Sequence, residues 1–439
     1  MAILRRTKVI WLVWVVRLLI GPLTDARCLA AQTNSAAGLS LTEAQGLAFH
    51  HNWDLIAARS DVDAATAQRI IAREFPNPTL SLGTSKLNVD GQPNSTTMGN
   101  GLWERSYDTV IAINQLIEIG GKRRSRQASS NAGLRGAEAR LADARRLLDQ
   151  GVAQAYVAVL LAERDQQILN ESAASLRKEA QIAAIRQKAG DISASDQSQI
   201  EIAASRLELD AQTAEANART ARIQLEILLG EKEPRGTVKL SEELEALTDF
   251  AGDPAAERIA MDQRADLAAA EAAKAKAQAD IRLQKALRVP DPTISFQYEH
   301  APAGAPNSIG VGISFPLPLW NRNHGNIAAA EAAAEQAAAQ AGKVRAQIVG
   351  DIATARSAFE SAQLRWRRYR EELLPKSLQV RETIAFAYER GGAALLDLLA
   401  AQRNYNEVRL ATAQAAADSA SAAAALRAAL LSFSKPASR

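Results

Sequence analysis

Cysteine and aromatic residues are scarce in this sequence. One cysteine occurs among 439 residues, and aromatic residues make up 5%. A single cysteine excludes an internal disulfide framework and a metal site built from several cysteines. The four histidines are His50, His51, His300 and His324, and none has the spacing of a zinc-binding pair. No catalytic set of residues stands out either, so we expect no metal site, no cofactor and no enzymatic activity.

Long hydrophobic runs are also missing. The apolar run at residues 9–16 is too short to cross a membrane as a helix. Basic residues at positions 5, 6 and 8 precede it and small residues follow near position 30, which is typical of a secretory signal peptide. We therefore expect residues 1–30 to be a signal peptide and the mature chain to begin at Ala31 or Gln32.

Cys28 lies beside the expected cleavage site, where a lipid-anchor cysteine would also lie. A lipoprotein signal has leucine three residues before its cysteine and a small residue directly before it. Here those positions hold Asp25 and Arg27. We expect no lipid on Cys28, and a mature chain beyond the inner membrane of a double-membrane bacterium.

An excess of positive charge is absent once the signal is set aside. The formal net charge is +3, and the first thirty residues hold five basic residues against one acidic residue, so the remainder is near −1. Nucleic-acid binding needs a basic surface, so we expect no nucleic-acid partner.

Against these absences, one stretch has a strong pattern. Residues 122–187 contain no proline, and their apolar residues recur every seven positions. This period is typical of a coiled coil, in which one seam of a helix faces its neighbour. At 1.5 Å per residue it predicts a helix of roughly 100 Å. The first row is Leu134, Leu141, Leu148, Ala155, Ala162, Leu169, Leu176 and Ala183, and the second is Ala137, Ala144, Val152, Val159, Ala173 and Ala180.

A sharp turn follows this helix. Gly190 suits the position just past a helix end, where the backbone is left-handed. Ser193 can cap the next helix, which runs back to residue 229. The sequence therefore predicts a long antiparallel hairpin over residues 122–229.

Shorter elements precede the hairpin. Ser40 and Glu43 have the spacing of a capping box, which predicts a helix at residues 41–50, and a second helix covers residues 54–74. Alternating and β-branched residues then predict strands at about 78–87 and 107–117, with a loop at 88–101 between them.

The same order is repeated after a linker at residues 230–254. Strands are expected at about 292–300 and 306–317, and a second long hairpin at 323–433, whose first helix runs from 323 to about 389. Matching segments lie about 200 to 214 residues apart, which indicates a tandem duplication. We therefore divide the mature chain into a first repeat at 31–229 and a second at 255–434.

The expected strands carry large apolar residues on one face and small or polar residues on the other. Membrane β-barrels have this alternation, with the apolar face in contact with lipid and the polar face toward the lumen. Four strands cannot close a barrel, and lipid does not tolerate open sheet edges. We therefore expect a homotrimer with a twelve-stranded barrel, four strands from each protomer, continued by a tube of helices. The apolar set includes Ile294, Phe296, Tyr298, Ile309, Val311, Ile313 and Phe315, and the small set includes Gly310, Gly312 and Ser314.

These features resemble the TolC family of trimeric outer-membrane factors, over nearly the whole mature chain. The junctions at residues 115–123 (QLIEIGGKR) and 315–323 (FPLPLWNRN) most resemble its heavy-metal branch, the cobalt–zinc–cadmium efflux type. The resemblance implies a passive export duct in the outer membrane with a periplasmic helical extension. It also implies a periplasmic adaptor (membrane fusion) protein and an inner-membrane pump of the resistance-nodulation-division class as partners. The junction residues are Gly120, Gly121, Lys122, Pro316, Pro318 and Asn321.

The resemblance also implies a periplasmic gate at the hairpin tips. It would comprise the turn glycines Gly190 and Gly391 with Asp196, Tyr388 and Asp397. Some members carry a second aspartate and an arginine where this chain has Ala400 and Ala393, so the latch can be built differently here. The alternative for Asp196 is an ordinary carboxylate at a helix N-terminus, where the helix dipole favours it.

Three further interpretations remain open. The basic cluster at residues 122–126 predicts a solvated helix start, and because basic residues are unfavourable there it also indicates an acidic neighbour. Trp103 and Trp320 fit as anchors at a membrane interface. The alternatives to metal efflux are organic drug efflux, type I protein secretion and, outside ducts, a structural coiled-coil scaffold.

Overall fold

The computed structural model describes residues 38–85, 108–248, 254–301 and 307–431. The expected signal peptide with Cys28, the loop at 88–101 and Trp103 lie outside these ranges. The chain divides into two units, Met1–Gly38 and Leu39–Arg439. Only Gly38 is described in the first unit, so all the described helices and strands belong to the second.

Two short helices open the second unit. α1 (Leu41–His51) begins with the predicted capping box, in which the Ser40 N–H donates to the Glu43 carboxylate at 2.9 Å and the Glu43 N–H donates to Ser40 Oγ at 3.3 Å. α2 (Trp53–Ile71) ends earlier than residue 74, the expected end. Its last residues close tighter turns ahead of Pro76, since the N–H groups of residues 73 and 74 bond to carbonyls three positions back.

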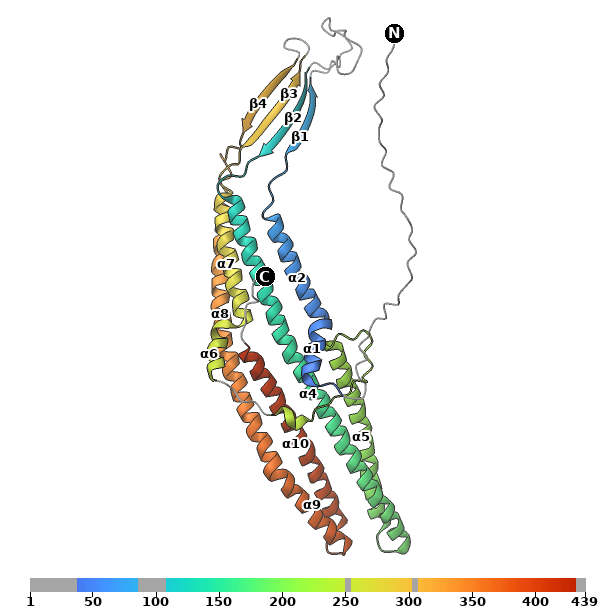
Figure 1. Cartoon of the computed structure of the whole chain (residues 1–439). Helices are drawn as coiled ribbons and strands as arrows, with labels where there is room; N and C mark the ends of the chain where they lie inside the picture. The colour runs from blue at the N-terminus through green and yellow to red at the C-terminus, as the bar shows by residue number, and fades with distance from the viewer. Residues whose placement is uncertain (1–37, 86–107, 249–253, 302–306, 432–439) are drawn as a thin grey trace, which may run out of the picture. The chain divides into compact units, whose positions relative to one another are not determined.

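Four strands form one antiparallel sheet in the order β1 (Thr79–Ser85), β2 (Asp108–Leu116), β3 (Thr293–His300) and β4 (Ser308–Ser314) (Figure 1). The two predicted strand pairs are present. Pairing of β2 with β3, which places Ile113 opposite Phe296, joins the two halves of the chain into a single sheet.

The first long hairpin has the predicted form. α4 (Lys122–Ala189) is an uninterrupted helix, and α5 (Ala194–Leu228) packs back along it (Figure 1). Every member of both seven-residue rows is buried or half-buried, so the period identified the packed seam correctly. The turn is also as predicted, because Gly190 has φ 87° and Ser193 Oγ accepts the Asp196 N–H at 3.0 Å.

The second half contains α6 (Pro254–Gln263), α7 (Ala265–Ala286), α8 (His324–Arg368), α9 (Leu374–Glu389) and α10 (Leu395–Leu430). The predicted helix from 323 to about 389 runs through α8 and α9, and a π-helical turn, η2 (Tyr369–Leu373), lies between them. Pro375 explains it: proline donates no N–H, and its ring clashes with the carbonyl four residues earlier. The wider π turn lets the helix continue past that point.

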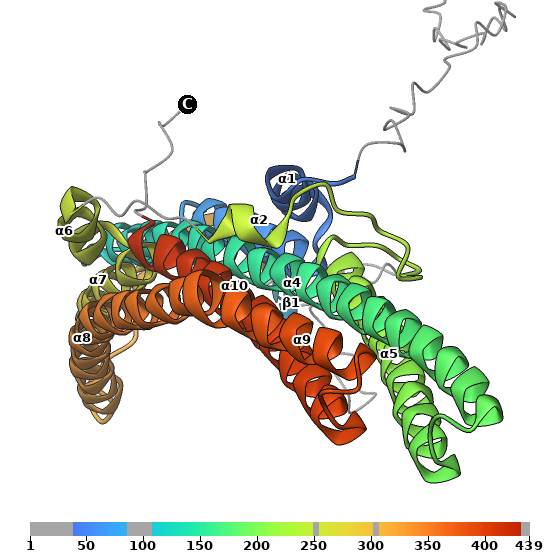
Figure 2. The same ribbon diagram turned by 90° about the horizontal axis from the view of Figure 1, so that it is seen from below.

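α4 is the central helix of the unit. It packs against α2, α5, α7 and α10, and Figures 1 and 2 both show α5 and α10 running alongside it. A buried cluster lies where α1, α4, α5 and α10 meet, and it contains Val152, Tyr156, Leu225 and Ala416. The Tyr156 hydroxyl donates to the Leu39 carbonyl at 2.8 Å, which fixes the start of the unit to α4.

The linker after α5 is held in place by one buried carboxylate. Glu226 accepts four backbone N–H bonds of 2.6 to 2.9 Å from residues 235–238. Beyond this loop, Leu39 and Leu240 form a parallel bridge, and a short 3₁₀ helix, η1 (Leu244–Leu247), follows. Residues 230–248 of the linker are thus held in an ordered segment beside α4.

Candidate functional site

The sheet exposes one continuous apolar face. Register brings Leu82 opposite Ile111, Ile111 opposite Tyr298 and Tyr298 opposite Ile309, so the large side chains of all four strands share a face. Leu82 is 70% exposed and Ile309 is 85% exposed. The other face carries small and polar residues such as Ser81 and Gly310. Exposed apolar area of this extent marks a surface that contacts lipid or another protein.

The first strand-to-helix junction is held by a compact cluster of polar contacts. Gly120 and Gly121 have φ of 71° and 76°, a conformation that favours glycine. Directly after them, Lys122 Nζ lies 2.6 Å from Asp291 Oδ2, while the Ile119 N–H donates to Asp291 Oδ1 at 2.9 Å. Because Asp291 precedes β3, these contacts join the two halves of the chain.

The interpretation of the basic cluster as a solvated helix start is wrong for Lys122, which is only 5% exposed. The acidic neighbours that the cluster indicated are present: Asp291 pairs with Lys122, and Glu118 pairs with Arg126 at 2.6 Å. These carboxylates offset the unfavourable placement of cations at the positive end of α4.

The second junction is more open. Asn323 takes the left-handed conformation with φ 61°, and Asn321 Oδ1 accepts its N–H at 3.0 Å. The Asn323 side chain donates to the Gln284 carbonyl at 2.8 Å, which fixes the start of α8 to the end of α7. Pro316, Pro318 and Trp320 are exposed, Trp320 at 93%.

The expected gate residues gather at the hairpin tips. Gly190, with φ 87°, directly follows α4, and Gly391, with φ 76°, follows α9 after one intervening residue. The Asp397 carboxylate accepts the Ala394 N–H at 3.2 Å in the first turn of α10. Asp196 occupies the equivalent position in α5. The Tyr388 ring packs against the Arg186 guanidinium, 5.8 Å from its centroid, so it connects the tips of the two hairpins.

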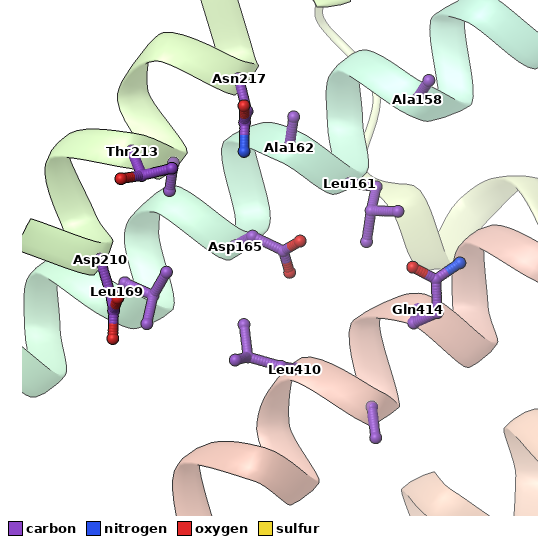
Figure 3. A pocket seen from close by; sticks show the side chains of 12 residues that line it. Ala158, Leu161, Ala162, Asp165, Leu169, Asp210, Thr213, Asn217, Leu410 and Gln414 are labelled. Atoms are coloured by element: carbon purple, nitrogen blue, oxygen red, sulfur yellow. The ribbon is translucent and has the colours of Figure 1, made fainter. Parts of the chain in front are cut away.

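A groove that sequence patterns did not identify lies between α4, α5 and α10 (Figure 3). Its volume is about 620 Å³, and Asp165 points into it among Leu161, Leu169 and Leu410. Burial raises the pKa of Asp165 to about 6. Asp165 belongs to neither seven-residue row. The only sequence signal for the groove is a gap in the second row, which has no apolar member between Val159 and Ala173.

Within residues 38–85, 108–248, 254–301 and 307–431, no three His, Cys, Asp or Glu side chains are grouped so that they could hold a metal ion. No helix in this part of the chain combines the length and apolar character needed to cross a membrane.

Comparison of the chain with known proteins identifies its family. Residues 46–231 and 258–430, which include both hairpins, match the family described as outer membrane efflux protein. The chain belongs to this family. As an outer membrane efflux protein it is a channel component for export through the outer membrane, and the family expected from the sequence is confirmed.

Individual relatives agree. The cobalt-zinc-cadmium resistance protein CzcC of Cupriavidus metallidurans is 26% identical over 378 residues, 86% of each protein. A membrane protein from Pseudomonas aeruginosa has a TM-score of 0.75 at 21% identity, covering 89% of this chain and 92% of that one. The outer membrane protein VceC from Vibrio cholerae has a TM-score of 0.73 at 21% identity, covering 89% and 95%. The last two likenesses establish the fold.

Proposed function

We propose that three copies of this outer membrane efflux protein form a duct for heavy-metal cations. Their sheets would close a twelve-stranded barrel in the outer membrane, and their hairpins would form a tube across the periplasm. The tube would meet a periplasmic adaptor and an inner-membrane pump of the resistance-nodulation-division class. A tandem duplication would supply six similar units to this ring.

The observation that supports the assembly most strongly is the sheet. Its exposed apolar face suits lipid, and its edges β1 and β4 have no partner among the described strands. Unpaired backbone groups are very costly in a bilayer, so a lipid-facing sheet must close on itself. Mass measurement in detergent is expected to give a stable trimer, and a stable monomer would contradict the assembly.

The choice of metal cations over drugs or proteins is supported by the likeness to CzcC, a cobalt-zinc-cadmium resistance protein. The lumen itself offers little discrimination, since a wide aqueous pore carries whatever the pump delivers. Metal selection would then belong to the pump.

Disruption of the gene in its own bacterium tests the substrate. We expect tolerance to cobalt, zinc or cadmium to fall and to return when the wild-type gene is restored, while tolerance to organic dyes is unchanged. Loss of dye tolerance alone would favour the drug-efflux alternative, and loss of a secreted protein would favour type I secretion.

A further inference from the structure

The contact between the two halves of one chain is a template for the contact between chains. The two strand pairs correspond residue by residue. Each residue of β1 is equivalent to the β3 residue 214 positions later, and each residue of β4 is equivalent to the β2 residue 200 positions earlier. The in-chain registers agree with this, since Leu80 opposite Ile113 in the first pair corresponds to Ile294 opposite Ile313 in the second. β2 pairs with β3 within the chain, so the equivalent pair is β4 with the β1 of another copy.

We infer that β4 of one copy pairs with β1 of the next so that Ile313 lies opposite the neighbouring copy's Leu82 and Ser314 opposite its Ser81, and that His324 faces the neighbouring copy's Asn77. The inference rests on the trimeric assembly proposed above and adds its register and its junction chemistry.

The register follows from the in-chain pair. Asn114 lies opposite Ser295 between β2 and β3, and the equivalents of these residues are Ser314 and Ser81. Facing residues then share a chemical class, because Ile313 and Leu82 both belong to the apolar face. A slip by one residue would bring Leu82 opposite Gly312 or Ser314 and mix the two faces of the sheet.

Exposure at the junctions supports the same seam. Phe75 is 69% exposed, whereas its equivalent Val289, which packs on the Gly120 junction, is 38% exposed. Leu317 is 64% exposed, whereas its equivalent Ile117, whose N–H bonds to the Pro292 carbonyl, is 39% exposed. In each pair the residue left uncovered in one chain is the one whose partner would come from another copy.

The junction chemistry differs between the two kinds of seam. Within the chain, buried Lys122 pairs with Asp291. Lys122 and His324 each begin a long helix directly after a left-handed residue, so they are equivalent if the second junction is two residues longer than the first, since the strands before them are 200 positions apart and these two residues are 202 apart. Asp291 and Asn77 are equivalent through the matching Pro-Asp-Pro and Pro-Asn-Pro segments. The in-chain ion pair is therefore replaced between chains by an imidazole facing an amide, and ion-paired and ion-pair-free seams alternate around the barrel.

Cysteine cross-linking tests the register. In a Cys28→Ser background, Ser81→Cys with Ser314→Cys should give covalent dimers and trimers that reducing agent dissolves. The equivalent in-chain pair, Asn114→Cys with Ser295→Cys, should oxidise without an increase in mass, which shows that this position accepts a disulfide. Thr79→Cys with Ser314→Cys, shifted by two residues, should cross-link at least about tenfold less, because the Cα atoms would lie beyond disulfide reach.

The outcomes separate the two proposals. Absence of a trimer for the parent protein would overturn the assembly. A normal trimer in which the in-chain pair oxidises, but Ser81→Cys with Ser314→Cys does not cross-link, would overturn the register alone.

A double-mutant cycle tests the junction. Asn77→Asp together with His324→Lys should create an ion pair between chains and raise the temperature at which the trimer dissociates above the sum of the two single effects. Simply additive effects would overturn the contact between His324 and Asn77.

Discussion

The ammonium group of Lys122 and the carboxylate of Asp291 lie 2.6 Å apart, although the two residues belong to opposite halves of the chain. Lys122 begins the first long helix, and Asp291 lies two residues before β3, which begins at Thr293. The pair lies where the sheet meets the helices, so it joins the start of α4 to the segment that leads into β3.

Removing the cation of this pair should destabilise the protein. Lys122→Ala leaves the Asp291 carboxylate mostly buried without its partner, and breaking a buried ion pair costs about 3 to 5 kcal/mol. The measurement is loss of helical circular dichroism on heating in detergent. The control is Arg235→Ala, which breaks an exposed pair with Glu233 and should cost less than about 1 kcal/mol. Equal effects of the two substitutions would contradict the role of Lys122.

The linker should depend on the charge of Glu226. Glu226→Gln replaces an acceptor of four N–H bonds, which should cost about 1 to 3 kcal/mol and release the loop at residues 235–238. Trypsin should then cleave faster after Arg235 at pH 8. Glu233→Gln, on an exposed side chain nearby, is the control. Cleavage no faster than in that control would contradict the prediction.

The same residue predicts sensitivity to acid. Burial raises the pKa of Glu226, but the four N–H bonds together lower it by more than burial raises it. The pKa of Glu226 therefore lies below its usual value of 4.5. A carboxyl with a lowered folded pKa stabilises the protein above its unfolded pKa and loses that contribution as pH falls through the folded value. In the parent protein, the melting temperature should therefore decrease as the pH is lowered below about 4.5. This decrease should be smaller in Glu226→Gln.

Asp165 should affect the pH dependence of stability in the opposite direction to Glu226. Its pKa is raised to about 6 by burial, so its charged form destabilises the fold above that pH. Asp165→Asn should stabilise the protein at pH 8 by roughly 1 to 2 kcal/mol, a value reduced for partial solvent screening. The gain should shrink as pH falls from 6 and vanish below about pH 3, where the parent carboxyl is protonated in both states. The control is Asp210→Asn, in the same groove. An equal gain at both pH values would show that charge is not the cause.

The hairpin tips should control ion selectivity. In the proposed trimer three Asp397 carboxylates face one another, and a ring of carboxylates attracts cations. Asp397→Ala should weaken cation selectivity in planar bilayers, and conductance should rise if Asp397 also latches the mouth. Asp196→Ala should act more weakly. Reversal potentials in a salt gradient, recorded on purified trimers, are the measurement.

A matched variant separates charge from helix capping at the same position. Asp397→Asn removes the charge but keeps an acceptor for the Ala394 N–H, which it bonds in the first turn of α10. It should lose selectivity as Asp397→Ala does. Parent selectivity and conductance in both variants would remove Asp397 from the gate.

The sequence by itself determined the local elements. A seven-residue apolar period favours a helix with one packed seam, and Gly190 followed by Ser193 favours a turn and a new helix start. Alternation of large and small residues likewise set the faces of the strands. These features depend on neighbours within a few positions, so their spacing is visible in the chain.

Only the tertiary structure decided which distant segments meet. Nothing in the spacing of β2 or β3 says that they pair, or that Asp291 receives the cation of Lys122, because such contacts depend on which edges and faces remain free after local elements form. Burial of Asp165 depends in the same way on where α10 crosses α4. Pro375 was visible in the sequence, but the continued packing of α9 and η2 against α10 decided that the helix widens there and does not end.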